Sequence, residues 1–415
     1  MSKNLIRIGK NSKKAFETKI SPKVKNKVLI DYIKLIKKNK KKIINQNTKD
    51  ILFARSKGLE ENLITRLALD NKKIQSIIKS IEKIIKIKDP VDRVLDQWIR
   101  PNGLKIKRVT IPIGVIGVIY ESRPNVTSDI STLCFKSGNC VILRGGSEAF
   151  NTNKILVNLF RSSLVKNKIN KSFVQFVDDK NKKLVDYMLS KMSKYLDVVI
   201  PRGGKSLVKK VKDLSTIPVI GHLEGICHTY LDKDANDKMS IKVTLNAKLR
   251  NTSICGATET LLIHKNKINL IKFILNELKK NHCEGVADSK IKKIYKGKIQ
   301  MANKKTWSTE HLSSKISVKL VNNIEDAIKH INKYGTMHTD AIITKNPKAA
   351  KYFIKKVKSS IAIHNSSTQF ADGGEFGFGG EVGISTNNLP PRGPIGLNQL
   401  VSYKYEIYGS GQIRK

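Results

Sequence analysis

The sequence is poor in aromatic and acidic residues and contains no long apolar segment. Aromatic residues make up only 6% of the 415 positions, and they do not interleave with the basic residues as in a platform that stacks single-stranded nucleic acid. No apolar run approaches the ~18–20 residues that span a bilayer. The N-terminus, Met1 to Lys14, lacks the apolar segment and small-residue cleavage site of a secretory signal. We therefore expect a cytoplasmic protein with no membrane association.

Cysteine is also scarce, and its spacing indicates free thiols. An odd number of cysteines, without CxxC pairs or zinc-ligand spacing, is typical of a reducing compartment. They are Cys134, Cys140, Cys227, Cys255 and Cys283. Cys134 and Cys140 flank an apolar helix–strand unit and are expected in the core. Cys227 lies in His222-Leu223-Glu224-Gly225-Ile226-Cys227-His228, which superficially resembles a metal site, but no matching cluster exists elsewhere, so we expect no metal.

The scarcity of acidic residues gives the chain a large positive charge. Lys plus Arg number 79 and Asp plus Glu 34, for a formal charge of +45. A basic surface attracts polyanions such as nucleic acid. However, 66 of the 79 basic residues are lysine, scattered beside abundant Ile and Asn, which is typical of an A+T-rich genome that places lysine on solvated faces. We favour this second interpretation and expect no nucleic-acid partner, although such a surface would steer an anionic substrate.

The length and the apolar pattern predict at least two domains. A single core rarely grows beyond ~250–300 residues, and a hydrophobic content of 40% is enough to fill more than one. The first ninety residues carry helical signals, namely a cap at Ser21-Pro22 and two apolar stripes at helical spacing. The stripes are Val28, Leu29, Tyr32, Ile33 and Ile36, and Ile74, Ile77, Ile78, Ile81, Ile84 and Ile85.

Beyond Pro101 the pattern changes to strands that alternate with helices. This alternation predicts an α/β fold with a doubly wound parallel sheet, and a second such series runs from about Thr229 to Ile363. The segments Asp96–Thr110 and Leu400–Tyr408 are strand-like and would form an arm exchanged between subunits of a homo-oligomer. The strands expected in the first series are Leu104–Thr110, Val115–Tyr120, Cys140–Leu143, Phe173–Val177 and Val198–Ile200.

Two glycine-containing turns follow predicted strands, at Arg144-Gly145-Gly146-Ser147 and at Gly203-Gly204-Lys205-Ser206. Glycine lets the backbone approach a phosphate, and a helix that begins after the turn points its N–H groups at an anion. Ordinary tight turns explain each of them equally well when taken singly. The second turn imitates the end of a P-loop, but the first glycine of that motif would fall at Val199, and no GxGxxG is present. A nucleotide would therefore bind through a different variant.

Cys255 has a setting unlike that of the other cysteines. It lies in the segment 251–259, among small and polar residues of a predicted loop. A thiol at a loop-to-helix junction can have its pKa lowered, which makes it a nucleophile. On spacing alone, an unremarkable free thiol remains the alternative.

Long segments of the chain resemble the gamma-glutamyl phosphate reductase family of the aldehyde dehydrogenase superfamily. The resemblance is collinear over essentially the whole chain. Its segments are Trp98–Leu104, Gly114–Asn125, Lys136–Glu148, Gly221–His228, the loop around Cys255, Asp372–Thr386, Arg392-Gly393-Pro394 and Gly409–Arg414. It implies an aldehyde dehydrogenase-like fold with a Rossmann-type cofactor domain, an α/β catalytic domain and a small β oligomerisation arm. The expected domains are 1–245 for NADP binding (with 96–110 in the arm), 246–385 for catalysis, and 386–415 for the return segment and oligomerisation strand.

The resemblance also implies an activity and a set of site residues. The activity is NADPH-dependent reduction of L-glutamate 5-phosphate to L-glutamate 5-semialdehyde with release of phosphate, the second step of proline biosynthesis from glutamate. Cys255 falls at the family's nucleophile and would form a thioester. The positions that match cofactor contacts of the superfamily are Arg144, Gly145, Gly146 and Ser147 at the adenosine ribose, Gly203 and Gly204 at the pyrophosphate, and Glu310 at the nicotinamide ribose. Functional coupling to glutamate 5-kinase is a further expectation.

Some positions depart from the pattern of the relatives. Glu224 lies near the place where hydrolytic relatives have their base but does not align with it, so it is not assigned. Arg123 stands where relatives carry an oxyanion asparagine; its guanidinium would grip the phosphate or a substrate carboxylate, or else form a salt bridge that lines the cleft. The glutamyl pocket is expected to include Ser366, Ser367 and Thr368. Gln369 and Pro390-Pro391 replace the residues expected there.

Two other functions stay open on the sequence. A non-phosphorylating aldehyde dehydrogenase would share the fold and the cysteine, but it would require an unambiguous base. A basic nucleic-acid-binding protein would explain only the charge. The reductase accounts for the glycine turns, the loop cysteine and the glycine-rich C-terminal segment together.

Overall fold

The computed structural model describes residues 2–121 and 123–414. Their contacts divide the chain into two compact units. Unit 1 comprises Met1–Gly221, Gly377–Gly383 and Ile395–Lys415, and unit 2 comprises His222–Phe376 and Ile384–Pro394. This division differs from the predicted boundary at residue 245. The boundary lies after residue 221 because the next strand, β7 (Cys227–Leu231), pairs with strands of unit 2 on both sides.

Helices form the N-terminal part of unit 1. The predicted start of the second helix is confirmed, because Oγ of Ser21 accepts a hydrogen bond from the N–H of Val24 at 3.4 Å and Pro22 occupies the first turn. Both predicted apolar stripes lie in the core, except that Ile85 is only partly buried. The helices are α1 (Ser2–Phe16), α2 (Pro22–Lys38), α3 (Lys40–Ser56), α4 (Glu61–Leu67) and α5 (Asn71–Lys86).

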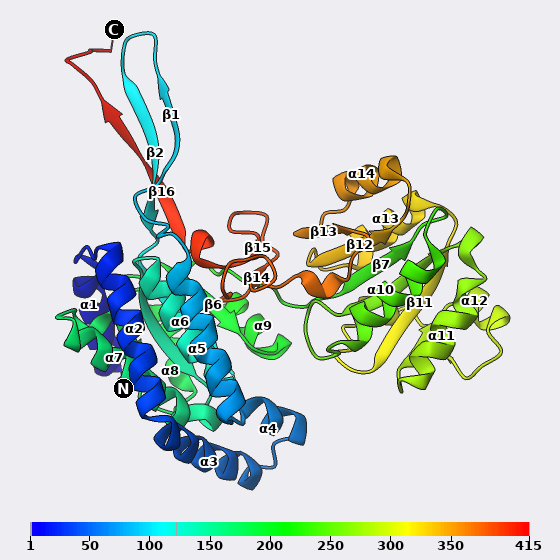
Figure 1. The fold of residues 1–415 in the computed structure, drawn as a ribbon, viewed down its shortest axis with the longest axis horizontal. Coiled ribbons are helices and arrows are strands. Elements are labelled where there is room, and N and C mark those ends of the chain that lie inside the picture. The colour runs from blue at the N-terminus through cyan, green and yellow to red at the C-terminus, as the bar shows by residue number, and fades with distance from the viewer. Residues whose placement is uncertain (1, 122, 415) are drawn as a thin grey trace. The chain divides into compact units, whose positions relative to one another are not determined.

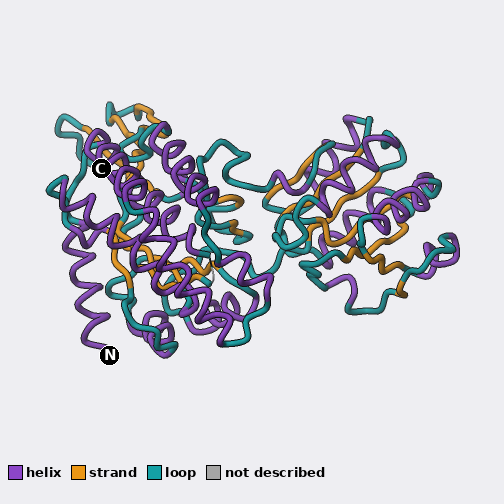
Figure 2. The backbone as a smooth tube through the Cα atoms, turned by 60° about the horizontal axis from the view of Figure 1, so that its bottom comes forward, coloured by secondary structure: helices purple, strands orange, loops and turns teal. Residues whose placement is uncertain are grey.

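A four-stranded parallel sheet forms the centre of unit 1, in the order β5-β4-β3-β6. Its strands are β3 (Val115–Tyr120), β4 (Cys140–Gly145), β5 (Val174–Phe176) and β6 (Val198–Arg202), and they are followed in turn by α6 (Pro124–Lys136), α7 (Phe150–Lys166), α8 (Lys183–Lys191) and α9 (Lys205–Leu214). Figure 2 shows helices surrounding these strands, and β3 is buried along its whole length. The strand order reverses at β3, and such a reversal opens a crevice at the carboxyl ends of the strands where nucleotides bind.

An antiparallel sheet in the order β1-β2-β16 extends from the helices of unit 1 (Figure 1). It joins the two segments predicted as an arm, as β1 (Val94–Ile99), β2 (Lys105–Pro112) and β16 (Val401–Tyr408), and β2 is the central strand. All three strands expose large apolar or aromatic side chains or lie beside strands that do, and a contiguous exposed apolar surface is typical of an interaction site. The exposed large apolar side chains are Val94, Leu95, Trp98, Ile99, Tyr403, Tyr405, Ile407 and Tyr408.

Unit 2 is built on a seven-stranded parallel sheet in the order β10-β9-β11-β8-β7-β12-β13. Besides β7, the strands are β8 (Thr258–His264), β9 (Glu284–Ala287), β10 (Gln300–Met301), β11 (Lys315–Val321), β12 (Thr339–Ile343) and β13 (Ile361–His364). The helices are α10 (Asp237–Leu249), α11 (Leu270–Lys280), α12 (Ser289–Ile294), α13 (Ile324–Tyr334) and α14 (Pro347–Lys356). A two-stranded ribbon of β14 (Ile384–Ser385) and β15 (Gly393–Pro394) completes the unit. Among the described residues, no helix has the length and apolar character needed to cross a membrane.

A buried carboxylate in unit 1 fixes one helix to the start of another. Asp50 of α3 is 1% exposed. It accepts hydrogen bonds from the backbone N–H groups of Asn151 and Thr152 at 3.1 and 2.7 Å, and from the Thr152 hydroxyl at 2.6 Å. These donors belong to the first turn of α7, whose N–H groups have no partner within the helix and favour a negative charge.

Replacement of Asp50 should therefore weaken unit 1 more than an ordinary surface change. We expect Asp50→Ala to lower the free energy of unfolding by ~2 kcal/mol, because buried donors of α7 lose their acceptor. Asp50→Asn should cost less, since its amide oxygen still accepts. Thermal unfolding followed by circular dichroism measures both, and equal stability of Asp50→Ala and the original protein would contradict the assignment.

Candidate active site

Cys255 lies at the amino edge of the sheet of unit 2, in the loop between α10 and β8. The predicted loop-to-helix junction is therefore wrong, because the loop leads into a strand. Gly225, just before β7, lies directly against this loop. A Cβ atom at Gly225 would overlap the carbonyl oxygen of Cys255 and stand 2.6 Å from its Cβ, so no side chain fits there.

Two histidines flank the thiol of Cys255. The Sγ atom and one ring nitrogen each of His222 and His338 all lie within 4.8 Å of one another. The two rings meet edge to face, with centroids 4.9 Å apart. Nδ1 of His222 is 2.7 Å from the carbonyl oxygen of Ile384, which fixes the ring of this half-buried residue. Three donors are one fewer than a closed structural zinc site uses, although an open catalytic zinc site uses three. We interpret this trio as an activated thiol.

His338 enters the site from the residue before β12 and is completely buried. Its Nδ1 lies 2.9 Å from Oγ1 of Thr339 and 3.4 Å from Sγ of Cys227. The Cys227 thiol in turn donates to the carbonyl oxygen of Cys255 at 3.0 Å. Cys227 therefore supports the loop, and its neighbour His228 is directed into a separate buried pair with Asp340.

The two imidazoles change the acidity of Cys255. Burial by itself raises the pKa of a thiol, but the positive charge and hydrogen bonds offered by His338 and His222 outweigh it and hold the pKa of Cys255 well below its ordinary value. Burial raises the pKa of Cys227 instead. One cysteine of this pair is thus prepared to act as a thiolate, whereas the other stays a neutral thiol.

A chain of charged groups supports Gly225, the glycine beside the Cys255 loop. Oε1 of Glu310 accepts a hydrogen bond from the N–H of Gly225 at 2.8 Å. The residues that follow Glu310 are held by Glu259, which accepts from the N–H of His311 at 3.0 Å and is paired with Lys248 at 3.1 Å. Lys248 and Glu259 are both fully buried. Burial raises the pKa of Glu259 to about 7, although Lys248 opposes this shift.

The predicted pocket residues lie next to the Cys255 loop but serve partly structural roles. Oγ1 of Thr368 is fully buried and lies 3.0 Å from Oγ1 of Thr258. The Ser367 side chain accepts from the N–H of Gln369, and Ser366 is half-buried. The buried amide of Gln369 binds Nε of Arg250 at 2.9 Å and several carbonyl oxygens at the end of α10. Gln369, which departs from the family pattern, therefore anchors the loop that carries Cys255.

The predicted cofactor residues of unit 1 lie at the carboxyl ends of β4 and β6, on either side of β3. The buried guanidinium of Arg144 donates to the carbonyl oxygen of Lys180 at 3.2 Å and also binds that of Gly145, while its Nε has no hydrogen-bond partner among the residues that the structure describes. The N–H of Gly204, at the start of α9, donates to a carboxylate oxygen of Glu121 at 2.7 Å.

The sequence thus singles out Cys255 as a candidate but not all of the residues around it. Arg123 stands directly before α6 in unit 1, whereas Glu310 lies with Cys255 in unit 2. In the sequence, His222 stands out only as part of a segment that superficially resembles a metal site. Its distance along the chain from Cys255 does not predict that the two side chains meet. His338 lies in no motif at all, and only the pairing of β12 with β7 brings it to the thiol.

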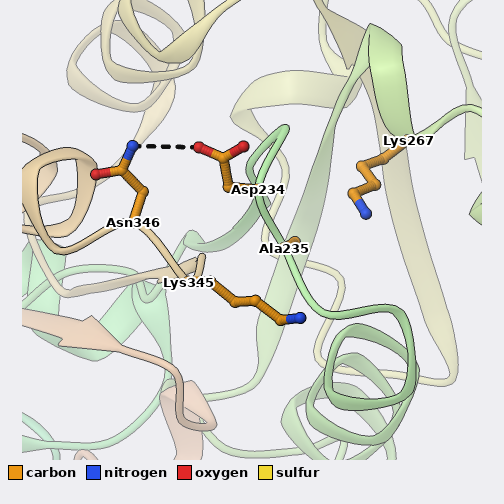
Figure 3. Close-up of a pocket in the computed structure, with 5 residues that line it drawn as sticks. All are labelled: Asp234, Ala235, Lys267, Lys345 and Asn346. Carbon is orange, nitrogen blue, oxygen red and sulfur yellow. Dashed lines mark hydrogen bonds between the residues drawn. The ribbon is translucent and has the colours of Figure 1, made fainter.

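A separate pocket lies at the other edge of the sheet. Figure 3 shows its lining residues, Asp234, Ala235, Lys267, Lys345 and Asn346. They follow the carboxyl ends of β7, β8 and β12, whereas Cys255 precedes β8. The pocket is therefore not part of the Cys255 site.

Comparison with solved structures identifies the fold. The crystal structure of an acetylating aldehyde dehydrogenase from Geobacillus thermoglucosidasius matches with a TM-score of 0.71, over 100% of this chain and 98% of that chain. The sequence identity is 14%, so this likeness shows the fold alone. The predicted aldehyde dehydrogenase-like fold is confirmed. No family model matches the chain.

More similar proteins identify the family. The gamma-glutamyl phosphate reductase of a Nitratiruptor species is 45% identical over 391 residues, which cover 94% of this chain and 95% of that protein. The reductase of Nautilia profundicola is 43% identical over the whole of both chains. A crystal structure of the reductase from Thermotoga maritima matches with a TM-score of 0.96 at 39% identity, over 99% of this chain and 100% of that chain. The chain belongs to the gamma-glutamyl phosphate reductase family and is an oxidoreductase.

The acidity of Cys255 gives a first test of the site. Because alkylation requires the thiolate, its rate should reach half of its maximum below the ~8.5 of an ordinary cysteine. His338→Asn removes the imidazole and should raise the pH of this midpoint, so that alkylation near neutral pH slows by about tenfold for each pH unit that the midpoint rises. Iodoacetamide modification followed by mass spectrometry of the Cys255 peptide measures the profile. Identical midpoints would contradict the assignment.

The Lys248–Glu259 pair gives a second test. Lys248→Met leaves a fully buried carboxylate without its counter-charge, which should destabilise unit 2 by ~3–5 kcal/mol. Lys267→Met is the matched control, because its pair with Asp237 is partly exposed and should contribute at most ~1 kcal/mol. Urea unfolding followed by the fluorescence of Trp307, in unit 2, compares the two. Equal losses would contradict the interpretation.

Proposed function

We propose that this chain reduces L-glutamate 5-phosphate to L-glutamate 5-semialdehyde with release of phosphate, using NADPH and a thioester on Cys255. The observation that carries the proposal is the thiol of Cys255 between two imidazoles, in a chain of the gamma-glutamyl phosphate reductase family. The reaction would be the second step of proline biosynthesis from glutamate. A thiolate is the form of cysteine that attacks an acyl phosphate carbon, so the lowered pKa matches this chemistry.

The residues of unit 1 fit a phosphorylated nucleotide. At the start of α9, the N–H of Gly204 already binds a carboxylate oxygen, so an anionic group suits this position, as a pyrophosphate would. A Cβ at Gly203 would stand 2.5 Å from the same carboxylate, so a larger residue there would displace the side chain of Glu121. Arg144, Gly145, Gly146 and Ser147 would hold the adenosine ribose and its phosphate, with the unpartnered Nε of Arg144 as one donor. The bound nicotinamide would supply the hydride.

The residues of unit 2 would carry the covalent steps. The Cys255 thiolate attacks the acyl carbon, phosphate leaves, and a thioester forms. An oxyanion develops on the acyl oxygen in both halves of the reaction, and the backbone N–H of Cys255 would stabilise it, at about 3 kcal/mol for one such donor. Glu310 would hold the nicotinamide ribose with the carboxylate oxygen that Gly225 does not occupy. Water must stay out, because hydrolysis of the thioester would waste the substrate.

Polar groups at the positions that match the family's substrate contacts would recognise the substrate. Arg123 would bind the phosphate or a carboxylate of the substrate. Ser366 and Ser367 would line the glutamyl pocket, while the side chain of Thr368 is committed to Thr258, so its backbone is the part left to contribute. Further expectations are a homo-oligomer formed through the exposed arm of β1, β2 and β16, and functional coupling to glutamate 5-kinase.

The reverse reaction tests the proposal. With glutamate 5-semialdehyde, phosphate and NADP⁺, we expect NADPH formation at 340 nm that depends on phosphate and disappears in Cys255→Ala. Cys134→Ala is a matched control, because this buried thiol lies in unit 1 and should not affect the chemistry. Turnover without phosphate would mean that water hydrolyses the thioester and would favour a non-phosphorylating aldehyde dehydrogenase. Comparison with NAD⁺ measures the cofactor preference.

A further inference from the structure

In the proposed reaction, the phosphate group needs a proton as it leaves the acyl carbon. When the thiolate of Cys255 displaces phosphate from an acyl phosphate dianion, the bond between the acyl carbon and the phosphate oxygen breaks. Without a proton, the leaving group would be the phosphate trianion, which is a strong base and a poor leaving group. A general acid beside the thiol would deliver that proton in the transition state. Cys255 cannot do so, because it reacts as the thiolate.

His222 has the geometry of a residue that exchanges a proton at one atom. Its Nδ1 lies 2.7 Å from the carbonyl oxygen of Ile384. A carbonyl only accepts hydrogen bonds, so Nδ1 carries its hydrogen in both forms of the ring. The proton that comes and goes is therefore the one on Nε2. The side chain is half-buried, so water can restore this proton after each turnover.

His338 is suited to a different role. It is completely buried, and its Nδ1 lies between the Thr339 hydroxyl and the Cys227 thiol. A threonine hydroxyl both donates and accepts, so this contact does not fix the position of the ring hydrogen. Burial separates the ring from solvent, so its contribution is to stabilise the charge of Cys255. Glu310 is a further charged group that interacts with Cys255 and His222, and Glu224 in turn interacts with Glu310.

We propose that the imidazolium of His222 is the general acid that protonates the departing phosphate, and that His338 is a positioning residue that stabilises the thiolate. In acylation, the bond from Sγ to the acyl carbon forms, the carbon–oxygen bond to phosphate breaks, and the Nε2 proton of His222 moves to the departing oxygen. Hydrogen phosphate leaves. Hydride then reduces the thioester, and the thiohemiacetal oxyanion collapses to the aldehyde and the Cys255 thiolate.

The neutral His222 then takes a proton from water, and one proton is consumed in each cycle. This balances an acyl phosphate, NADPH and a proton against an aldehyde, phosphate and NADP⁺. The inference rests on the proposed function. In the reverse direction, Nε2 of His222 removes the proton from hydrogen phosphate as it attacks the thioester, whereas formation of the thioester from aldehyde and thiolate needs no proton transfer to His222.

The reverse reaction separates these two steps. Enzyme, glutamate 5-semialdehyde and NADP⁺ without phosphate should form one NADPH per active site, which reports acylation. Addition of phosphate should then start steady turnover, which reports phosphorolysis. The measurement is made above the ordinary cysteine pKa of ~8.5, so that the thiol is ionised in every variant. His222→Asn and His222→Gln should keep the first phase and slow the phosphate phase by about 100-fold or more.

The controls distinguish acid–base catalysis from a merely structural role. His338→Asn should slow both phases near neutral pH and recover both at the alkaline pH. His282→Asn is the matched control, because this exposed histidine has a positive φ of 55°, which asparagine tolerates, and neither phase should change. In the unsubstituted enzyme, deuterium oxide should slow the phosphate phase but not the first phase, so the test does not depend on the folding of a variant.

Four outcomes would overturn the inference. Equal slowing of both phases in the His222 variants would assign His222 to thiol activation alone. An unchanged phosphate phase in these variants would show that another group transfers the proton. The absence of a solvent isotope effect on this phase would show that no proton transfer takes part in its rate-limiting step, which contradicts general acid–base catalysis there. If the unsubstituted enzyme forms no NADPH or shows no dependence on phosphate, the proposed function itself fails, and the proton transfer fails with it.

Discussion

The contact between the backbone at Gly225 and the loop of Cys255 is the constraint on which the rest of the site depends. Because residue 225 has no side chain, the segment before β7 can lie against the loop before β8. His222 and Cys227, on either side of this glycine, are thereby brought to the thiol and to the carbonyl oxygen of Cys255. His338 arrives from the start of β12, the next strand in the sheet. The segments that precede three adjacent strands, β8, β7 and β12, therefore meet around the Sγ atom of Cys255.

Charged side chains hold Gly225 in its contact with the Cys255 loop. Glu310 holds the N–H of Gly225, and Glu259 holds the segment that carries Glu310. Glu259 depends on Lys248 for its counter-charge in a fully buried position. A buried ion pair adds little to the free energy of unfolding compared with apolar residues of similar size. An arrangement in which one charge is buried without its partner is strongly destabilised. The pair therefore favours one position of the glycine, and with it one position of the thiol.

The sequence predicted well those features that depend on local periodicity. The apolar stripes of α2 and α5, the buried strands β3 and β4 and the position of Cys255 in a loop follow from spacing and composition, although the element after that loop is a strand and not the expected helix. The domain boundary could not be predicted in this way, because the assignment of β7 depends on which strands it pairs with. His338 could not be found either, since a lone histidine before a strand has no local signal. The imidazoles of His222 and His338 come close to Cys255 only because β7, β8 and β12 pair in the sheet.

The pairing of β16 with β2 has a consequence for synthesis of the chain. These strands are separated by about three hundred residues, which include all of unit 2. During translation, β2 therefore has one open edge until β16 leaves the ribosome, and loop closure over such a distance is slow. Nascent chains must keep this edge from pairing wrongly for most of their synthesis. A chain that stops before β16 would never close it, so the arm is completed only after both units have been made.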